Sequence, residues 1–280
     1  MTPSTLPNIV KSSIRRRVVG LFNDVERGQT PVVRSADALF VPNSVVWRVH
    51  GDVGSMMVGG VASLLLQMLH PAVLAGVWDH SNFRQDMHGR LRRTARFIAM
   101  TTYGERSAAE AAITTVRRVH DRVSGTLPDG TPYRANDAEL LAWVHVTETS
   151  SFLDAWIRYS EPLMSLADQD RYFAQMAQVG EALGAAPLPH SRAQARQLIA
   201  AMRSQLKVDG RTKEVAGLIL AGRGAPAMGD VPRKLAMQAA IDLLPDWARR
   251  MHGFAISPLE RPLVRAGTFG VAQTLRWAFR

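Results

Sequence analysis

The segment from Gly54 to Trp78 carries no Asp, Glu, Lys or Arg, and it constrains the fold more than any other feature of this chain. A helix without a charged face is buried on all sides, either inside a large domain or in a membrane. Gln67 and His70 place polar side chains in this stretch, and Pro71 ends or kinks a helix near Leu69. We therefore predict a buried central helix followed by a second short helix, and not a transmembrane span.

The rest of the chain also favours helices. Apolar residues recur at helical spacing, and no segment shows sustained alternation of β-branched apolar and polar residues, so we expect little sheet. The expected helices span residues 13–26, 90–103, 107–123, 136–159, 168–183, 191–206, 232–243 and 258–277. This pattern predicts an all-α, bundle-like or globin-like multi-helix domain, with any functional site between facing helices.

Residues 1–45 differ from the rest of the chain. They contain Pro3, Pro7, Pro31 and Pro42, which is typical of a leader or capping segment, and we expect residues 46–280 to form the helical domain. The short amphipathic helix expected at 13–26 includes the one tight basic run, Arg15-Arg16-Arg17. Such a helix can cap the domain or lie on a membrane surface, and we favour the cap.

Composition excludes several classes of protein. The chain has no cysteine, which rules out disulfides, iron–sulfur clusters and thiolate-ligated haem. The net charge is +10, but the basic residues are spread along the chain and no nucleic-acid-reading motif is present, so we expect no nucleic-acid partner. Neither Met1–Ile9 nor Val18–Phe22 forms the apolar core of an export signal, so we expect a cytoplasmic protein.

The chain also lacks a Gly-rich phosphate loop, a dinucleotide fingerprint and a nucleophile elbow, so histidines in apolar surroundings carry the chemical interest. His120 shares one face of its helix with apolar residues, namely Ala109, Ala112, Ile113, Val116 and Val123. A buried imidazole must satisfy both of its nitrogens. His120 is therefore either a hydrogen-bonded core residue or a metal ligand.

Other residues offer weaker signals. His145-x-x-Glu148 places a histidine and a carboxylate on one helix face, as a metal site or as a hydrogen-bonded pair. His70 ends the buried segment, and Asp79-His80 follows the next expected helix; each can line a pocket or end a helix.

A basic cluster opens the helix expected at 90–103. Arg90 and Thr94 lie one turn apart, with Arg93 on a neighbouring face. Arginines beside a threonine can bind a carboxylate or a propionate through charge-assisted hydrogen bonds. A solvated basic turn is the alternative.

In this order along the chain, these residues resemble the family of the latex-clearing rubber oxygenases and the fungal oxygenase MpaB. The resemblance is strongest over residues 47–156. The matching elements are Gly59-Gly60, Leu64-Leu65-Leu66-Gln67, His70-Pro71, Gly76-Val77, His80-Ser81, Gly89 to Thr94, Tyr103-Gly104, Val119-His120 with Val123 and Gly125, and Asp137 and Leu140 with Trp143-Val144-His145. The tail after about Ala185 resembles the family only loosely.

The resemblance implies a globin-like core built around haem b, and O₂-dependent oxidation or cleavage of apolar substrates. It places the family's iron-binding histidine on His120. Its arginine and threonine, which maintain the haem site, fall on Arg90 and Thr94. The basic residue before the threonine, which reaches the distal side of haem in rubber oxygenases, is Arg93 here.

Arginine stays protonated and cannot act as a neutral amine ligand, so Arg93 is a departure from the family pattern. Asp79 or His80 would then supply the distal base, and His70 and His145 would line the cofactor pocket. We expect a haem b-dependent oxygenase that uses O₂ on an apolar small or lipid-like molecule. The alternatives are a haem-binding sensor or carrier, and a cofactor-free helical protein that contacts anionic membranes peripherally.

Overall fold

The fold is all-α, as the sequence predicts. A computed structural model describes residues 6–222, 229–257 and 259–280. The helices are α1 (Leu6–Phe22), α2 (Val45–His50), α3 (Val53–Gln67), α4 (Pro71–His80), α5 (Met87–Tyr103), α6 (Arg106–His120), α7 (Ala138–Tyr159), α8 (Leu166–Leu183), α9 (Arg192–Met202), α10 (Gly210–Ala221), α11 (Asp230–Leu243), α12 (Asp246–His252) and α13 (Glu260–Phe279), with 3₁₀ turns at Val25–Arg27 and Arg203–Gln205. Within the described residues the only sheet is an antiparallel hairpin of β1 (Ser124–Thr126) and β2 (Pro132–Arg134).

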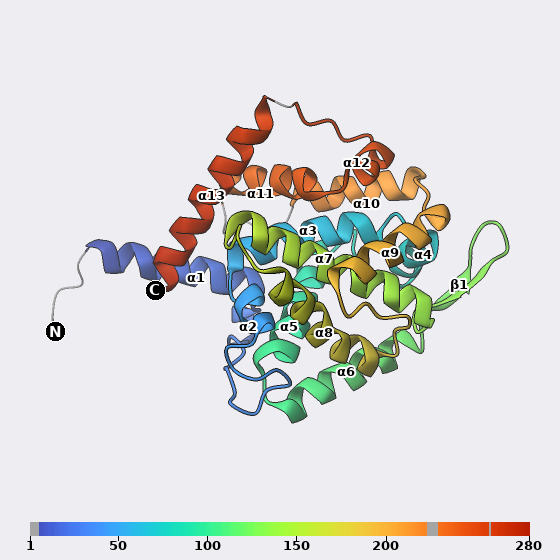
Figure 1. Ribbon diagram of the computed structural model, residues 1–280, viewed down its shortest axis with the longest axis horizontal. Coiled ribbons are helices and arrows are strands. Elements are labelled where there is room, and N and C mark those ends of the chain that lie inside the picture. The colour runs from blue at the N-terminus through green and yellow to red at the C-terminus, as the bar shows by residue number, and fades with distance from the viewer. Residues whose placement is uncertain (1–5, 223–228, 258) are drawn as a thin grey trace.

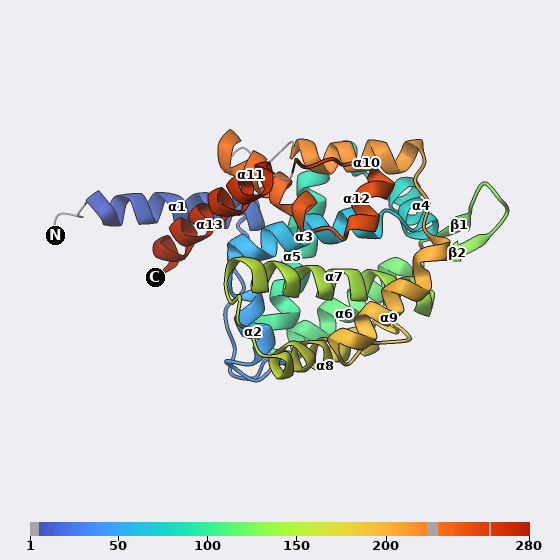
Figure 2. The same ribbon diagram turned by 45° about the horizontal axis from the view of Figure 1, so that its top comes forward.

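Helix α3 is the central helix expected from the uncharged segment. None of its residues is exposed, and it runs alongside α7 through the middle of the molecule (Figures 1 and 2). The two backbones approach closely at Gly59, where a Cβ atom would lie only 2.8 Å from the carbonyl oxygen of Ser151. A glycine is therefore required where α3 meets α7.

The break after α3 follows the proline. Pro71 occupies the first turn of α4, where its missing N–H costs nothing, and His70 is the preceding N-cap residue. Taken singly, none of the described helices is both long and apolar enough to cross a membrane. Helices α3 and α4 reach that length and composition only as a pair, and the chain bends by 103° between them.

Several helix boundaries differ from prediction. The expected helix 107–123 ends at His120, because the chain turns there into the β1–β2 hairpin, which projects away from the ends of α1 and α13 (Figure 1). The first helix spans 6–22 and not 13–26, and α9 ends at Met202 before a 3₁₀ turn. Pro258, the expected start of the last helix, lies outside the described residues.

Three shorter helices, α2, α10 and α12, were not predicted. Helix α10 has a sequence signal, since the side chains of Asp209 and Thr212 form a reciprocal capping box at its start. Helices α2 and α12 are too short for a periodic pattern to reveal them.

Helix α13 connects the end of the chain to its beginning and to the core. It packs along α1, and Lys11 lies 5.1 Å from the centre of the Trp277 ring. Figure 1 shows the C-terminal end of α13 lying against α1. Arg276 of α13 also donates to Asp52 at the start of α3, over 2.6 Å.

Candidate functional site

Helices α5 and α6 form a hairpin that places Arg90 beside His120. They are joined by Gly104 and Glu105, and they pack against each other along their length. Residues equally far from the turn of an antiparallel hairpin lie opposite each other, so the first turn of α5 meets the last turn of α6. Burial lowers the pKa of the His120 imidazole most, and the positive charge of Arg90 nearby lowers it further.

His120 is largely buried, and one nitrogen of its imidazole is left unpartnered. Its Nδ1 is inaccessible to solvent and has no hydrogen-bond partner among the described residues. The nearby Asn136 side chain opposes the effect of burial and raises the pKa, but its Oδ1 is also unpartnered, so no hydrogen bond of ordinary geometry joins the two side chains. Burial is the largest effect and lowers the pKa of His120, which keeps the ring neutral.

Arg90 is a mostly buried cation without an anionic partner. No described carboxylate or carbonyl accepts a hydrogen bond from its guanidinium, and burial followed by the charge of Arg93 lowers its pKa. By contrast, Arg93 is 64% exposed and pairs with Asp86 at 3.5 Å. Thr94 is exposed and donates to the carbonyl of Arg90 over 3.3 Å. The hairpin therefore brings Arg90, and not Arg93, to His120.

His145 and Glu148 lie one turn apart on α7, and His145 packs against Gly180 of α8. Burial lowers the pKa of His145 to about 4, so the ring is neutral, and its Nε2 is buried without a described partner. Burial also raises the pKa of Glu148 to about 7. No hydrogen bond joins the two side chains, so the His–Glu pair considered from sequence does not form.

Glu148 borders a polar network that the sequence does not reveal. Its charge raises the pKa of Tyr172 on α8, although burial of Tyr172 is the larger cause. The hydroxyl of Tyr172 lies 2.8 Å from His50 Nε2, and His50 Nδ1 lies 2.8 Å from the hydroxyl of Thr102. The network draws on α2, α5, α7 and α8, so no local motif could have indicated it.

The remaining predicted residues lie elsewhere. The His70 Nε2 and the Gln205 Oε1 are hydrogen-bonded, at a distance of 3.0 Å. Asp79 accepts a hydrogen bond of 2.9 Å from Tyr133, and exposed His80 lies 3.0 Å from the carbonyl oxygen of Ser124. Asp79 and His80 therefore lie against the β1–β2 hairpin. Neither of them, nor His70, forms a hydrogen bond with His120.

A bare metal ion would need several protein ligands in one place. Among the residues that the structure describes, no group of three or more His, Asp or Glu side chains is arranged to hold one. His120 and Arg90 are instead suited to a prosthetic group, because the imidazole can donate one ligand and the guanidinium can bind an acidic substituent.

Comparison with known proteins decides the family. The model of the family described as ER-bound oxygenase mpaB/B′/rubber oxygenase, catalytic domain, matches residues 47–277. The chain belongs to this family. The match confirms the resemblance seen at 47–156 and extends it through the tail, where the similarity by motif is loose. No curated protein and no solved structure matches significantly.

Membership of the mpaB/rubber oxygenase family supports an oxygenase role, and an oxygenase domain uses O₂ and a small-molecule substrate. The family match begins within α2 and ends within α13, and it includes every predicted site residue.

Proposed function

We propose that this protein is a haem b-dependent oxygenase acting on an apolar small molecule, and that His120 would bind the haem iron. One observation carries the proposal: the partly buried guanidinium of Arg90 has no described acid partner and lies beside His120, whose Nδ1 is buried without a hydrogen-bond partner. Leaving a buried ring nitrogen without a partner, next to a partly buried cation without an anion, is costly inside a protein.

Haem satisfies both residues at once. A haem propionate is an acid that Arg90 can bind through charge-assisted hydrogen bonds. The iron needs one further ligand from the protein, and a neutral histidine is a common choice. When bound, haem would supply the O₂ chemistry that an oxygenase requires. The low pKa of His120 favours this role, because only the neutral ring has a free lone pair.

The protein's own groups would shape the reaction space. Phe97 and Ile98 on α5 are partly buried against the core, so they offer an apolar wall that excludes water. Glu148 can hold a proton on its carboxyl group near neutral pH, since burial raises its pKa to about 7. Neutral His145 would border the same interior as a second polar group. This combination suits an apolar substrate.

We assign no chemical step to Arg93, Asp79 or His80. Each is exposed and already has a protein partner: Asp86, Tyr133 and the Ser124 carbonyl respectively. We also propose a cytoplasmic location.

The cofactor assignment is tested by absorption spectroscopy. Protein produced with an adequate haem supply should show a Soret band. His120→Gly should lose or shift that band, and added imidazole should restore it by filling the vacated ligand position. His190→Gly is the control, because His190 is exposed and remote in sequence from the site. Protein without a Soret band, or a His120→Gly variant with the wild-type spectrum, would contradict the assignment.

Arg90→Met should weaken haem binding by about tenfold or more, because a charge-assisted hydrogen bond to a propionate is lost. Arg90→Lys should lie between this variant and wild type. Exposed Arg118 on α6 provides the matched control, and Arg118→Met should leave haem affinity unchanged. Equal losses in both methionine variants would show that only overall charge matters.

Catalysis is tested with isotopically labelled O₂ and a panel of apolar molecules. Incorporation of label into a product, lost in His120→Gly, would establish the oxygenase. Haem binding without O₂ consumption on any of these molecules would favour a sensor or carrier.

A further inference from the structure

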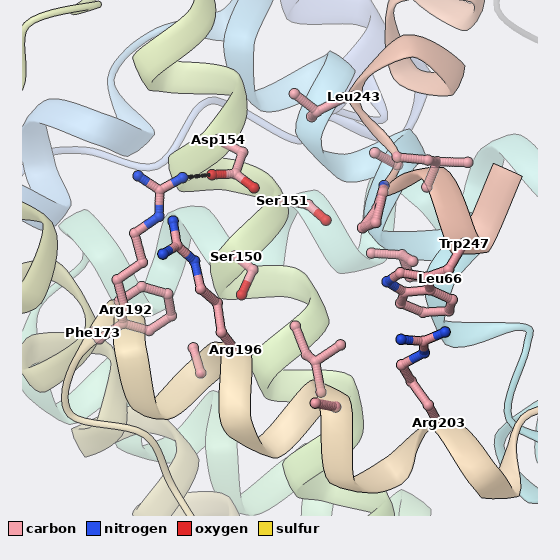
Figure 3. Close-up of a pocket in the computed structure, with 16 residues that line it drawn as sticks. Leu66, Ser150, Ser151, Asp154, Phe173, Arg192, Arg196, Arg203, Leu243 and Trp247 are labelled. Carbon is pink, nitrogen blue, oxygen red and sulfur yellow. Dashed lines mark hydrogen bonds and ion pairs between the residues drawn. The ribbon is translucent and has the colours of Figure 1, made fainter.

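A cavity of about 350 Å³ opens between α9, α7 and the turn from α11 to α12 (Figure 3). Leu66, Phe173, Leu243 and Trp247 contribute apolar surface to its walls. Polar groups from α7 and α9 gather on one side, namely Ser150, Ser151, Asp154, Arg192 and Arg196. The size falls within the range of small-molecule pockets.

This cavity is separate from the proposed haem site. Ser150 and Asp154 project from α7 on the side opposite to His145 and Glu148, because 3.6 residues complete a helical turn. The cavity walls come from α3, α7, α8, α9 and the α11–α12 turn, and they include no residue of α5 or α6.

The polar side of the cavity carries an excess positive charge. Arg192 donates to the carboxylate of Asp154 over 2.5 Å, which pairs these two residues. Arg196 lies one turn further along α9 and extends to the same side of the cavity (Figure 3). Arg196 forms no hydrogen bond or ion pair with any described residue, so two guanidinium groups face one carboxylate.

The charge of Arg196 reaches the cavity. Burial raises the pKa of Asp154, and the guanidinium groups of Arg192, Arg158 and Arg196 oppose that rise. The hydroxyls of Ser150 and Ser151 also line the cavity, and neither bonds to a described group. Arg196 and these hydroxyls together form a set of hydrogen-bond donors without an acceptor.

The other side of the cavity is mostly apolar and carries one cation, Arg203. The Arg203 guanidinium lies 5.1 Å from the centre of the Trp247 ring. Leu66 is beside the same indole in Figure 3. An apolar chain placed against Leu66 and Trp247 would be removed from water.

We propose that this cavity binds an apolar molecule with a single carboxylate, such as a fatty acid, whose carboxylate accepts hydrogen bonds from Arg196 and whose chain extends toward Trp247. A monoanion matches the one uncompensated positive charge on this side of the cavity, that of Arg196, because the Arg203 guanidinium lies at the other side against Trp247 (Figure 3). A phosphate dianion fits less well, because Asp154 stands at the same side of the cavity and would repel it.

Isothermal titration of the full chain with decanoate and decan-1-ol, both below the concentration at which they aggregate, tests the proposal. The two ligands share a chain and differ in the carboxylate. Decanoate should bind at least about tenfold more tightly, as expected for hydrogen bonds to a charged group. Arg196→Met should bring the ratio close to one while leaving decan-1-ol binding unchanged.

Two further variants locate the ligand. Arg171→Met removes the same charge from an exposed position on α8 and should preserve the tenfold preference. Ile199→Trp fills the cavity from the α9 wall and should weaken both ligands by about tenfold, with a circular dichroism melt to verify folding. Equal binding of the two ligands by wild type, or a preference that survives Arg196→Met, would overturn the proposal. Tighter binding of decyl phosphate than of decanoate would also overturn the proposal.

The same titration on His120→Gly separates this proposal from the haem proposal. Decanoate binding should be retained whether or not haem is bound. Loss of decanoate binding in His120→Gly would place the ligand on the other side of α7 and overturn the second site, while leaving the Soret test of haem unaffected.

Discussion

Glu148 shows how position inside the fold changes the chemistry of one residue. An ordinary glutamate is ionised at neutral pH, but burial raises the pKa of Glu148 from 4.5 to about 7. The folded protein therefore binds more protons than the unfolded chain between these two pH values. Its stability must fall as the pH rises through this window, because the unfolded chain ionises freely.

We predict that Glu148→Gln removes this pH dependence. The variant should be more stable than wild type at pH 8 by up to about 3 kcal/mol, and the difference should shrink as the pH is lowered toward 4.5. Urea denaturation of both proteins across this pH range measures it. Glu181→Gln, which changes an exposed carboxylate on α8, should leave the pH profile as in wild type. An unchanged profile in Glu148→Gln would mean that Glu148 is ionised in the folded state.

The contact between α3 and α7 is the main constraint at the level of elements. A Cβ atom at Gly59 would lie 2.8 Å from the Ser151 carbonyl oxygen and 3.0 Å from the Phe152 Cα, both of which are backbone atoms that cannot turn aside. At neighbouring Gly60 the nearest atom is Phe152 Cε1 at 3.7 Å, which is ordinary contact.

Gly59→Ala should therefore destabilise the protein by about 1–3 kcal/mol, because the two helices must separate. Gly60→Ala should be neutral or stabilising by up to about 1 kcal/mol, since alanine favours a helix over glycine. Thermal denaturation of both variants provides the comparison. Equal effects of the two substitutions would show that the α3–α7 spacing does not limit stability.

At the scale of the whole molecule, Asp242 joins elements that are distant in sequence. Its side chain on α11 is 0% exposed and forms ion pairs with Arg158 of α7 at 3.0 Å and Arg265 of α13 at 2.7 Å. A third arginine, Arg261, lies 3.6 Å away. These contacts attach the C-terminal helices to the central pair.

Asp242→Asn should destabilise the protein by about 2–4 kcal/mol, because three guanidinium groups lose their shared counter-charge while remaining partly buried. Asp230→Asn is the control: Asp230 is 82% exposed in its pair with Arg233, and its loss should change stability by less than about 1 kcal/mol. Chemical denaturation at constant pH distinguishes them. A small effect of Asp242→Asn would show that α11 and α13 are held mainly by apolar packing.

The sequence by itself determined the helical class and the central helix, because both follow from local periodicity and from an uncharged segment that only a core can accommodate. It also indicated that His120 and Arg90 belong together, through the family motifs. Their proximity has a simple cause: a short turn joins two helices of similar length, so the distance along each helix sets which residues meet.

Only the tertiary structure decided which side chains are left without partners. Arg90 and Arg93 are equivalent by composition, yet one is mostly buried and unpaired while the other is exposed beside Asp86. The raised pKa of Glu148 and the unpaired Arg196 likewise depend on groups from other helices. Burial and pairing are properties of packing between distant segments, and no local pattern in the sequence encodes them.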